Sequence, residues 1–213
     1  MEIEVAGETL LLLPEKAIYW KQGSALFLSD LHLAKDGHFR RNGFAVPANM
    51  SRVTLDRLSA IIDSCQPSTI YFLGDLFHSE YNRQVDLLKE WYRTYAHVKL
   101  VLISGNHDIM DSAVYEALQL QVVPESLYLP PFELVHAPPE NPLPDRYYLC
   151  GHLHPAFRLT GRGRQSLRLP CFWMGERIGV LPAFGAFTGS KSIKAQQTDS
   201  VYVVAEQQVV QVQ

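Results

Sequence analysis

The sequence predicts an α/β fold, because short apolar runs of strand length alternate with longer segments of helical periodicity. Five runs rich in β-branched, aromatic or aliphatic residues have the length of a buried strand: residues 25–29, 69–73, 98–103, 132–135 and 147–150. Helices are expected between them, over residues 48–65, over 79–95, and from a cap at Asp111 through Leu120. Residues 2–13, a hairpin turning at Gly7, and the alternating residues 200–213 are expected to complete a second sheet.

Length and composition favour one domain over residues 1–213. The chain has 213 residues, of which 47% are hydrophobic, and no shift in composition marks a linker. It has no apolar run long enough to cross a bilayer and no basic leader with a cleavage site, so we expect no membrane association. The three cysteines, Cys65, Cys150 and Cys171, are odd in number and widely spaced, which favours the reducing cytoplasm.

Metal-binding side chains follow each of the five predicted strands. In chain order they read Asp30-x-His32, Gly74-Asp75-Leu76-Phe77-His78, Gly105-Asn106-His107-Asp108, His136 and Gly151-His152-Leu153-His154. A single histidine is more often a core or surface group than a ligand, but five ordered matches in strand-then-turn context favour a site. Because sites in open α/β sheets form beyond the carboxyl ends of strands, we expect these side chains to converge at one edge.

The types of donor atom restrict the metal. Carboxylate, amide oxygen and imidazole without thiolate suit manganese, iron, nickel or zinc, whereas a set of oxygens alone would suit magnesium or calcium. The absence of cysteine from the motifs also disfavours a purely structural zinc site.

From about Leu26 into its second half, the chain resembles the calcineurin-like binuclear metallophosphoesterases. The resemblance implies two mixed β-sheets packed as a sandwich and flanked by helices (αββα). It also implies two divalent metal ions. Asp30, His32, Asp75 and His154 would hold the first ion, and Asp75, Asn106, His136 and His152 the second. Asp75 would bridge two cations about 3.5 to 4 Å apart, and a bridging hydroxide would attack phosphorus.

His107 is the candidate general acid of this chemistry. It lies beside Asn106 in the sequence, and a histidine can donate a proton near neutral pH. Asp108 is expected to orient it. The alternative is that His107 only hydrogen-bonds the loop.

A narrower resemblance covers nearly the whole chain. The segments that carry it are Asp30-Leu31-His32-Leu33-Ala34-Lys35, Phe39-Arg40, Arg168-Leu169-Pro170-Cys171-Phe172-Trp173, Leu181-Pro182-Ala183-Phe184-Gly185 and Phe187-Thr188-Gly189. They are similar to the bacterial ligase-associated DNA damage response metallophosphoesterases. That similarity implies a manganese-dependent endonuclease on single-stranded DNA in DNA repair, associated in function with an ATP-dependent DNA ligase and a helicase. Ala34 and Ser190 depart from this family, which usually has glycine at both positions.

Contacts with an anionic substrate would have to come from local basic strips, because the formal net charge is −3. The strip after the first motif contains Lys35 and Arg40, for which we favour substrate contact over simple solvation. A second strip contains Arg158, Arg162, Arg164, Arg168 and Arg177, and for it both interpretations stay open. His78 is either a substrate or outer-shell contact or a residue at the entry of a helix.

Two other functions remain as alternatives at this point. One is a small-molecule phosphodiesterase or phosphomonoesterase, which would turn over cyclic nucleotides or monoesters and ignore DNA. The other is a non-catalytic scaffold on the same fold, like the retromer subunit. The scaffold is disfavoured because all the candidate ligands and His107 are present.

Overall fold

The computed structural model describes residues 1–33, 50–77, 83–161, 165–186 and 188–213, and within them the chain forms two β-sheets and three helices. The first sheet has seven strands in the order β1-β2-β3-β4-β5-β6-β7. They are β1 (Glu2–Val5), β2 (Glu8–Leu12), β3 (Ile18–Trp20), β4 (Ala25–Leu28), β5 (Thr69–Leu73), β6 (Lys99–Ile103) and β7 (Leu120–Val123). Strands β4 to β7 are parallel, and β1 to β4 pair antiparallel.

The amino-terminal hairpin belongs to this first sheet, so the prediction that it completes a second sheet is wrong. The reason is β3, a three-residue strand that the sequence analysis did not identify. It pairs antiparallel with β2 on one side and with β4 on the other, and so attaches the hairpin to the parallel strands. Gly7, with φ of 82°, turns the hairpin as predicted.

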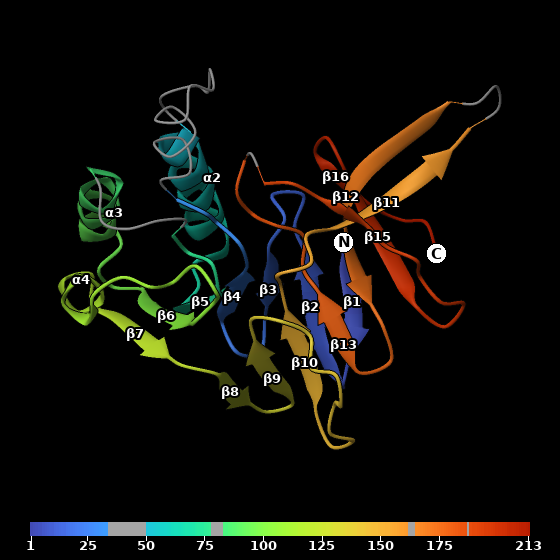
Figure 1. Cartoon of the computed structure of the whole chain (residues 1–213), viewed down its shortest axis with the longest axis horizontal. Helices are drawn as coiled ribbons and strands as arrows, with labels where there is room; N and C mark the ends of the chain where they lie inside the picture. Colours follow the sequence, from blue (N-terminus) through green and yellow to red (C-terminus); the bar gives the residue numbers. More distant parts are fainter. Residues whose placement is uncertain (34–49, 78–82, 162–164, 187) are drawn as a thin grey trace.

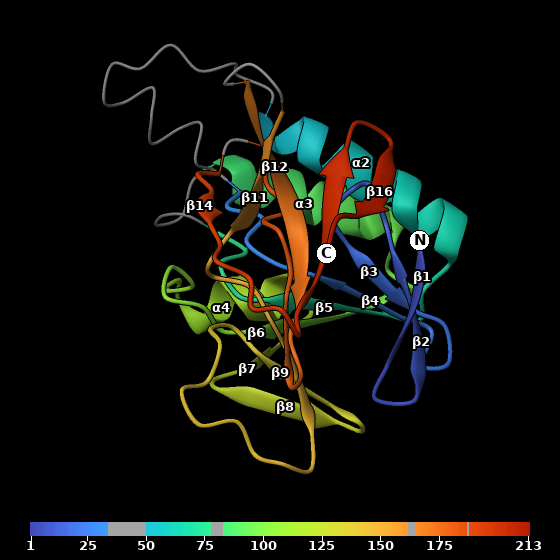
Figure 2. The same cartoon turned by 90° about the vertical axis from the view of Figure 1, so that its right-hand side faces the viewer.

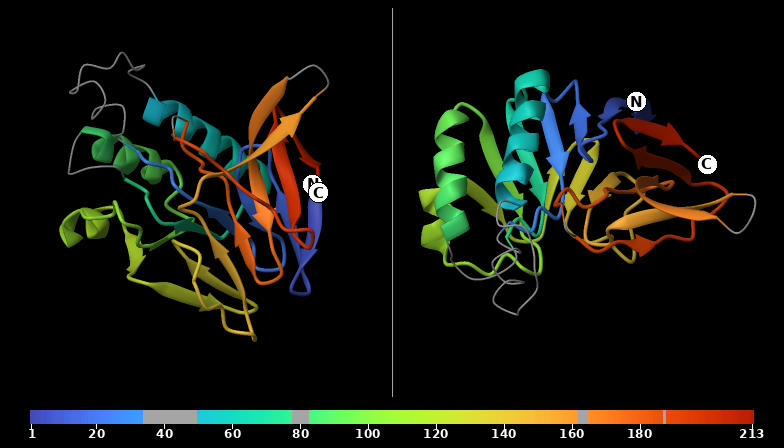
Figure 3. Two further views of the ribbon diagram at one scale, coloured as in Figure 1. Left: turned by 45° about the vertical axis from the view of Figure 1, so that its right-hand side comes forward. Right: turned by 90° about the horizontal axis from the view of Figure 1, so that it is seen from above.

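The three helices pack against one face of the first sheet. They are α2 (Met50–Cys65), α3 (Arg83–Thr94) and α4 (Ser112–Ala117), and Figures 1 and 3 show them together on the side away from the second sheet. Asp111 caps α4 as predicted, its side chain accepting a hydrogen bond from the Ala113 N–H. The helix ends at Ala117 rather than Leu120, because Leu120 begins β7.

The second sheet has nine strands, seven of them in the order β14-β11-β12-β13-β10-β9-β8. They are β8 (Ser126–Leu129), β9 (Phe132–Val135), β10 (Tyr147–Cys150), β11 (Pro155–Thr160), β12 (Ser166–Met174), β13 (Ile178–Val180) and β14 (Lys191–Ser192). The carboxyl-terminal strands β15 (Ser200–Ala205) and β16 (Gln208–Gln211) join this sheet through β12, as the sequence predicts.

Three apolar clusters show how the layers pack. The core between the sheets includes Phe27 of β4, Phe132 of β9 and Phe172 of β12. A second cluster joins the other face of the first sheet to the three helices, and a third, around Cys171 and Val203, lies on the outer face of the second sheet. The two-sheet α/β class is therefore confirmed. Among the described residues, however, the flanking helices cover the first sheet and none covers the second.

The carboxyl ends of parallel strands in both sheets meet at one edge. The backbone of Ser29, just after β4, forms a parallel bridge with Ala183, which follows β13. The Phe184 N–H donates to the Ser29 carbonyl at 2.8 Å, and the Leu181 N–H donates to the Cys150 carbonyl at 2.8 Å. Because both sheets share one core and one edge, we infer a single domain over residues 1–213. Of the described helices, none is long and apolar enough to cross a membrane.

Candidate metal centre

The predicted ligands follow strands of both sheets. Asp30, Asp75 and the Asn106 turn come after β4, β5 and β6 of the first sheet, whereas His136 and His152 come after β9 and β10 of the second. Convergence therefore depends on two sheet edges meeting, and not on one edge alone as expected.

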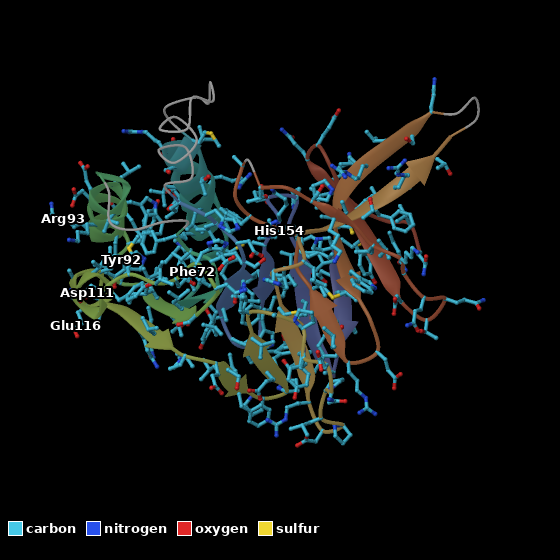
Figure 4. The ribbon with its side chains drawn as sticks, viewed as in Figure 1. Phe72, Tyr92, Arg93, Asp111, Glu116 and His154 are labelled. Atoms are coloured by element: carbon cyan, nitrogen blue, oxygen red, sulfur yellow. The ribbon has the colours of Figure 1, made fainter. Side chains whose placement is uncertain are left out.

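One group of side chains with metal-ligating atoms consists of Asp30, His32 and His154. Their ligand atoms all lie within 4.8 Å of one another. The His154 Nε2 is 3.2 Å from the Asp30 Oδ1, and the rings of His32 and His154 are 5.4 Å apart between centroids. Asp30 is fully buried and His154 is partly exposed, so the group opens to solvent on the His154 side. Figure 4 shows His154 near the middle of the molecule.

A second group consists of Asp30, Asp75 and His136, all buried. The two carboxylate oxygens of Asp75 face different imidazoles. Its Oδ2 is 3.8 Å from the His32 Nε2, and its Oδ1 is 3.6 Å from the His136 Nε2. The Nδ1 of His152 lies 3.1 Å from the same His136 nitrogen. The two groups share Asp30, and the carboxylate of Asp75 faces one imidazole of each group, as the predicted bridging role requires.

Two of the histidines are oriented by carbonyl oxygens. The Nδ1 of His136 is 3.0 Å from the Leu73 carbonyl, and the Nδ1 of His154 is 2.9 Å from the Gly189 carbonyl. A ring whose Nδ1–H donates to a carbonyl can offer the Nε2 lone pair to a metal once that nitrogen is deprotonated. In both residues the Nε2 points into the cluster while the Nδ1 meets a carbonyl, and donation of the second ring N–H to such an acceptor is common in metal-ligating histidines.

The backbone is strained at most of the candidate ligands. Asp30, His32, Asp75, His152 and His154 all have φ between 46° and 65°, in the left-handed region that favours glycine. Each such residue costs about 1–3 kcal/mol, and strain of this kind concentrates at functional sites. The hydrogen bonds from the His32 N–H to the Asp75 carbonyl (2.9 Å) and from the His152 N–H to the Asp30 carboxylate (3.0 Å) help to hold these turns.

Three glycines of the motifs leave space for the side chains of candidate ligands. A Cβ on Gly74 would lie 2.0 Å from the His136 Nδ1, and one on Gly151 would lie 2.4 Å from the Asp30 carboxylate. A Cβ on Gly105 would lie 2.4 Å from the Asp75 Oδ1. The glycines of these motifs are therefore required by the close approach of backbone to ligand side chains.

The Asn106 to Asp108 turn closes over Asp75. The His107 N–H donates to the Asp75 Oδ1 at 3.0 Å, and the exposed His107 ring lies 5.6 Å from that of His32. Asn106 is also exposed, at the tip of this turn. Asp108 accepts hydrogen bonds from the backbone N–H groups of Gly105 (2.9 Å) and Phe77 (3.3 Å). These contacts show that Asp108 holds the turn against the loop that follows β5, while its action on the His107 ring stays a prediction.

Burial raises the pKa of the Asp108 carboxyl above its usual value, although both backbone donors oppose that shift. At Asp30, burial also acts to raise the pKa. There it is outweighed by the hydrogen bond with His154 and by the charges of His154 and His136, so the pKa falls below its usual value. A buried carboxylate kept ionised by its neighbours is suited to hold a cation.

The donor atoms present fit divalent metals. Two ligands about 2.1 Å from one cation lie roughly 3.0–3.4 Å apart, close to the spacings between the Asp30, Asp75 and histidine atoms. The separations of 3.6 and 3.8 Å around Asp75 are too long for hydrogen bonds, although they are within the range of ion pairs. The remaining predicted contacts, Lys35, Arg40 and His78, lie outside the described residues.

Residues 24–171 match the family model of the calcineurin-like phosphoesterases, and this segment contains every candidate ligand. The chain belongs to the calcineurin-like phosphoesterase family. A solved structure, Pseudomonas putida nuclease MPE, is similar to the whole chain. It has 34% sequence identity and a TM-score of 0.84, with 100% of this chain and 99% of that chain covered.

Yfce, a phosphoesterase from E. coli, is more distantly similar. It has 18% identity and a TM-score of 0.49, with 88% of this chain and 97% of that chain covered. No curated protein matches the chain by sequence.

In this calcineurin-like phosphoesterase, the sequence analysis did not identify the contacts that hold the loop containing Asp30 in place. The Gly185 N–H donates to the Asp30 carbonyl at 3.1 Å. Two half-buried basic side chains also donate hydrogen bonds to this segment. Lys16 donates to the Gly185 carbonyl at 3.3 Å, and Arg57 donates to the Phe184 carbonyl with its guanidinium over the Phe184 ring. Burial lowers the pKa of Lys16 to about 8, with the charge of Arg57 adding to the shift.

No motif marks these two residues, because Lys16 lies in a turn and Arg57 in a helix far along the chain. The resemblance did point to the Phe184-Gly185 segment, without indicating what holds it. A basic residue that interrupts the apolar face of an expected helix is the only signal that could have suggested Arg57.

Proposed function

We propose that this protein is a metal-dependent phosphodiesterase that cleaves single-stranded DNA internally in DNA repair. The observation that carries the proposal is the similarity of the whole chain to a nuclease of the same family, and it is supported by the grouping of Asp30, His32, Asp75, His136 and His154 at the edge shared by the two sheets. A phosphoesterase that has kept every ligand position and a histidine at the rim is equipped for catalysis.

Two metal ions are part of this proposal. Asp30, His32, Asp75 and His154 would hold one ion, and Asp75, Asn106, His136 and His152 the other. When bound, two such ions activate water as a nucleophile and stabilise charge on phosphoryl oxygens. Manganese is the metal we propose, because the family resemblance of the sequence implies it. The mixed set of oxygen and imidazole ligands suits manganese, iron, nickel and zinc alike.

The chain's own residues supply the proton for the leaving group. The His107 ring is exposed at the rim, on the solvent side of His32, where the departing sugar oxygen of a bound strand would lie. We propose that His107 donates a proton to this oxygen. Its backbone is fixed by the Asp75 carboxylate, and Asp108 holds the turn closed, so the ring is presented from a defined position.

The proposed setting is the cytoplasm, with an ATP-dependent DNA ligase and a helicase as functional associates. All three cysteines are free thiols, which supports a reducing compartment. The association with a ligase and a helicase is carried only by the family resemblance of the sequence.

Covalently closed circles of single-stranded DNA test the proposal directly. The purified protein is incubated with manganese and such circles, and conversion to linear fragments is measured. A circle offers no end to an exonuclease, so linear products require internal cleavage. Asp75→Ala is the control for a contaminating nuclease. Intact circles with wild-type protein that hydrolyses a small phosphodiester would contradict the proposal and favour a small-molecule phosphoesterase.

A further inference from the structure

The second sheet carries a two-stranded arm that begins at the candidate metal centre. Strand β11 starts at Pro155, directly after His154, and pairs with the amino-terminal half of β12. Figures 1 and 2 show these strands extending beyond the rest of the second sheet. A substrate long enough to leave the metal centre along this strand would lie against the arm.

Two arginines face each other on the arm. The pairing of β11 with β12 places Arg158 directly opposite Arg168, with both residues exposed. Side chains opposite one another in an antiparallel pair have Cβ atoms about 4.5–5.5 Å apart, and like charges at that spacing are destabilising. Within the described parts of the chain, neither arginine forms an ion pair. The repulsion is therefore not relieved by an acidic neighbour there, and an anion from outside the chain would relieve it.

The arginines also lie on the inward face of the arm. Successive residues of a strand point to opposite faces, and Phe157 and Leu169 pack on the outer cluster of the second sheet. Arg158 and Arg168 therefore share the other face, which continues along β12 to Phe172 in the core between the sheets. Farther along β12, the same face packs in the core against the first sheet.

The distance along the arm selects for long substrates. Arg158 is four residues beyond His154, which corresponds to roughly 13 Å of extended strand. A small phosphodiester bound at the metal centre does not reach that far, but a strand of several nucleotides does. Each guanidinium can bind a phosphate through two parallel hydrogen bonds.

We propose that Arg158 and Arg168 form a phosphate-binding pair that holds the nucleic-acid strand beyond the phosphate being cleaved. This inference rests on the proposed function, because it assigns the strand a path out of the same centre. It makes the arm a determinant of substrate length: polynucleotides use it and small diesters do not.

Two variants separate phosphate binding from stability. Arg158→Gln with Arg168→Gln removes both charges, and Arg158→Glu introduces a carboxylate that can pair with Arg168. Binding of a fluorescent single-stranded oligonucleotide is measured by anisotropy in EDTA, so that no metal-dependent turnover occurs. We expect both variants to bind at least roughly tenfold more weakly than wild type, while Arg158→Glu melts at a higher temperature.

The salt dependence gives a second readout. For single strands, each phosphate contact contributes about −0.7 to the slope of log K against log salt, so the double glutamine variant should lose about 1.4 from the slope. The matched control is Arg93→Gln with Lys99→Gln, which removes the same charge from two exposed residues, one in α3 and one at the amino end of β6. A loss as large in the control would mean that net charge alone is responsible, and the proposal would be overturned.

Cleavage assays then distinguish a failure of the proposed phosphate-binding pair from a failure of the proposed function. The rate on circular single-stranded DNA is divided by the rate on bis-(p-nitrophenyl) phosphate, and this ratio should fall about tenfold in the double glutamine variant. An unchanged ratio, with wild type active on DNA, overturns the role of the arm and leaves the proposed function standing. Wild-type protein that hydrolyses only the small diester overturns both.

Discussion

Replacing Gly105 with alanine should damage the metal centre through a single added methyl group. Gly105 follows β6, and an added Cβ would lie 2.4 Å from the Asp75 Oδ1, 2.5 Å from the Asp75 backbone nitrogen and 3.0 Å from the His136 Cε1. Ordinary contacts of this kind begin at 3.4 Å, so the turns have to separate by 3.4 − 2.4, or about 1.0 Å.

The neighbouring strands prevent an easy separation. Strands β5 and β6 are paired in register from Thr69 with Lys99 to Leu73 with Ile103, and one of the close contacts is with backbone. Overpacking of a tight site costs about 1–3 kcal/mol. For a chain of this size that corresponds to a fall in melting temperature of roughly 2–12 °C. A 1 Å displacement of Asp75 should also lower turnover about a hundredfold.

Three measurements test the Gly105→Ala prediction: the melting temperature, the manganese bound after desalting, and the hydrolysis of a small phosphodiester. Gly161→Ala is the matched control, because its added Cβ meets nothing nearer than 3.9 Å. Equal melting temperature, metal content and turnover in Gly105→Ala and wild type would refute the steric argument. Loss of metal and turnover in Gly105→Ala, with Gly161→Ala unchanged, would support it.

Three further outcomes are expected. His107→Ala should retain metal and lose most turnover, more so for substrates with poor leaving groups; equal losses for good and poor leaving groups would argue against proton donation. Manganese at a hundred times its dissociation constant should stabilise the wild type by about 2.7 kcal/mol, and a melting shift that persists in Asp75→Ala would place the ion elsewhere. Because the pKa of Lys16 is lowered from 10.5 to about 8, the unfolded chain binds more protons between these pH values, so this residue makes stability rise with pH across that window. Urea unfolding at pH 7.5 and pH 10 should show a smaller rise, by up to about 3 kcal/mol, in Lys16→Met than in wild type, and an identical rise would contradict the assignment.

The motif strands could be predicted closely from the sequence. The apolar runs at 69–73, 132–135 and 147–150 are the strands β5, β9 and β10, and the run at 25–29 differs from β4 by one residue. These strands are buried on both faces, so their composition alone distinguishes them from the surrounding chain. The candidate ligands could be proposed for the same reason, since each lies within four residues of the end of such a strand.

The distribution of strands between sheets could not be predicted in this way. Pairing depends on contacts between residues far apart in sequence, and a three-residue strand such as β3 carries almost no periodic signal. Its pairing with β4 nevertheless decides that the amino-terminal hairpin joins the first sheet. Strands β11 and β12 likewise bear no motif of their own, and only their register shows that Arg158 is opposite Arg168.

The metal centre combines features that the sequence reveals with features that only the fold supplies. Side-chain chemistry and the position after a strand identify Asp30 and Asp75, but their left-handed backbone conformations are unfavourable in isolation. Something must hold them in place, and at Asp30 it is the Phe184-Gly185 segment, itself bound by Lys16 and Arg57. Those contacts join residues 16, 57 and 185, so no local pattern encodes them. Substitutions at Lys16 or Arg57 should therefore act on the centre although neither side chain is a ligand.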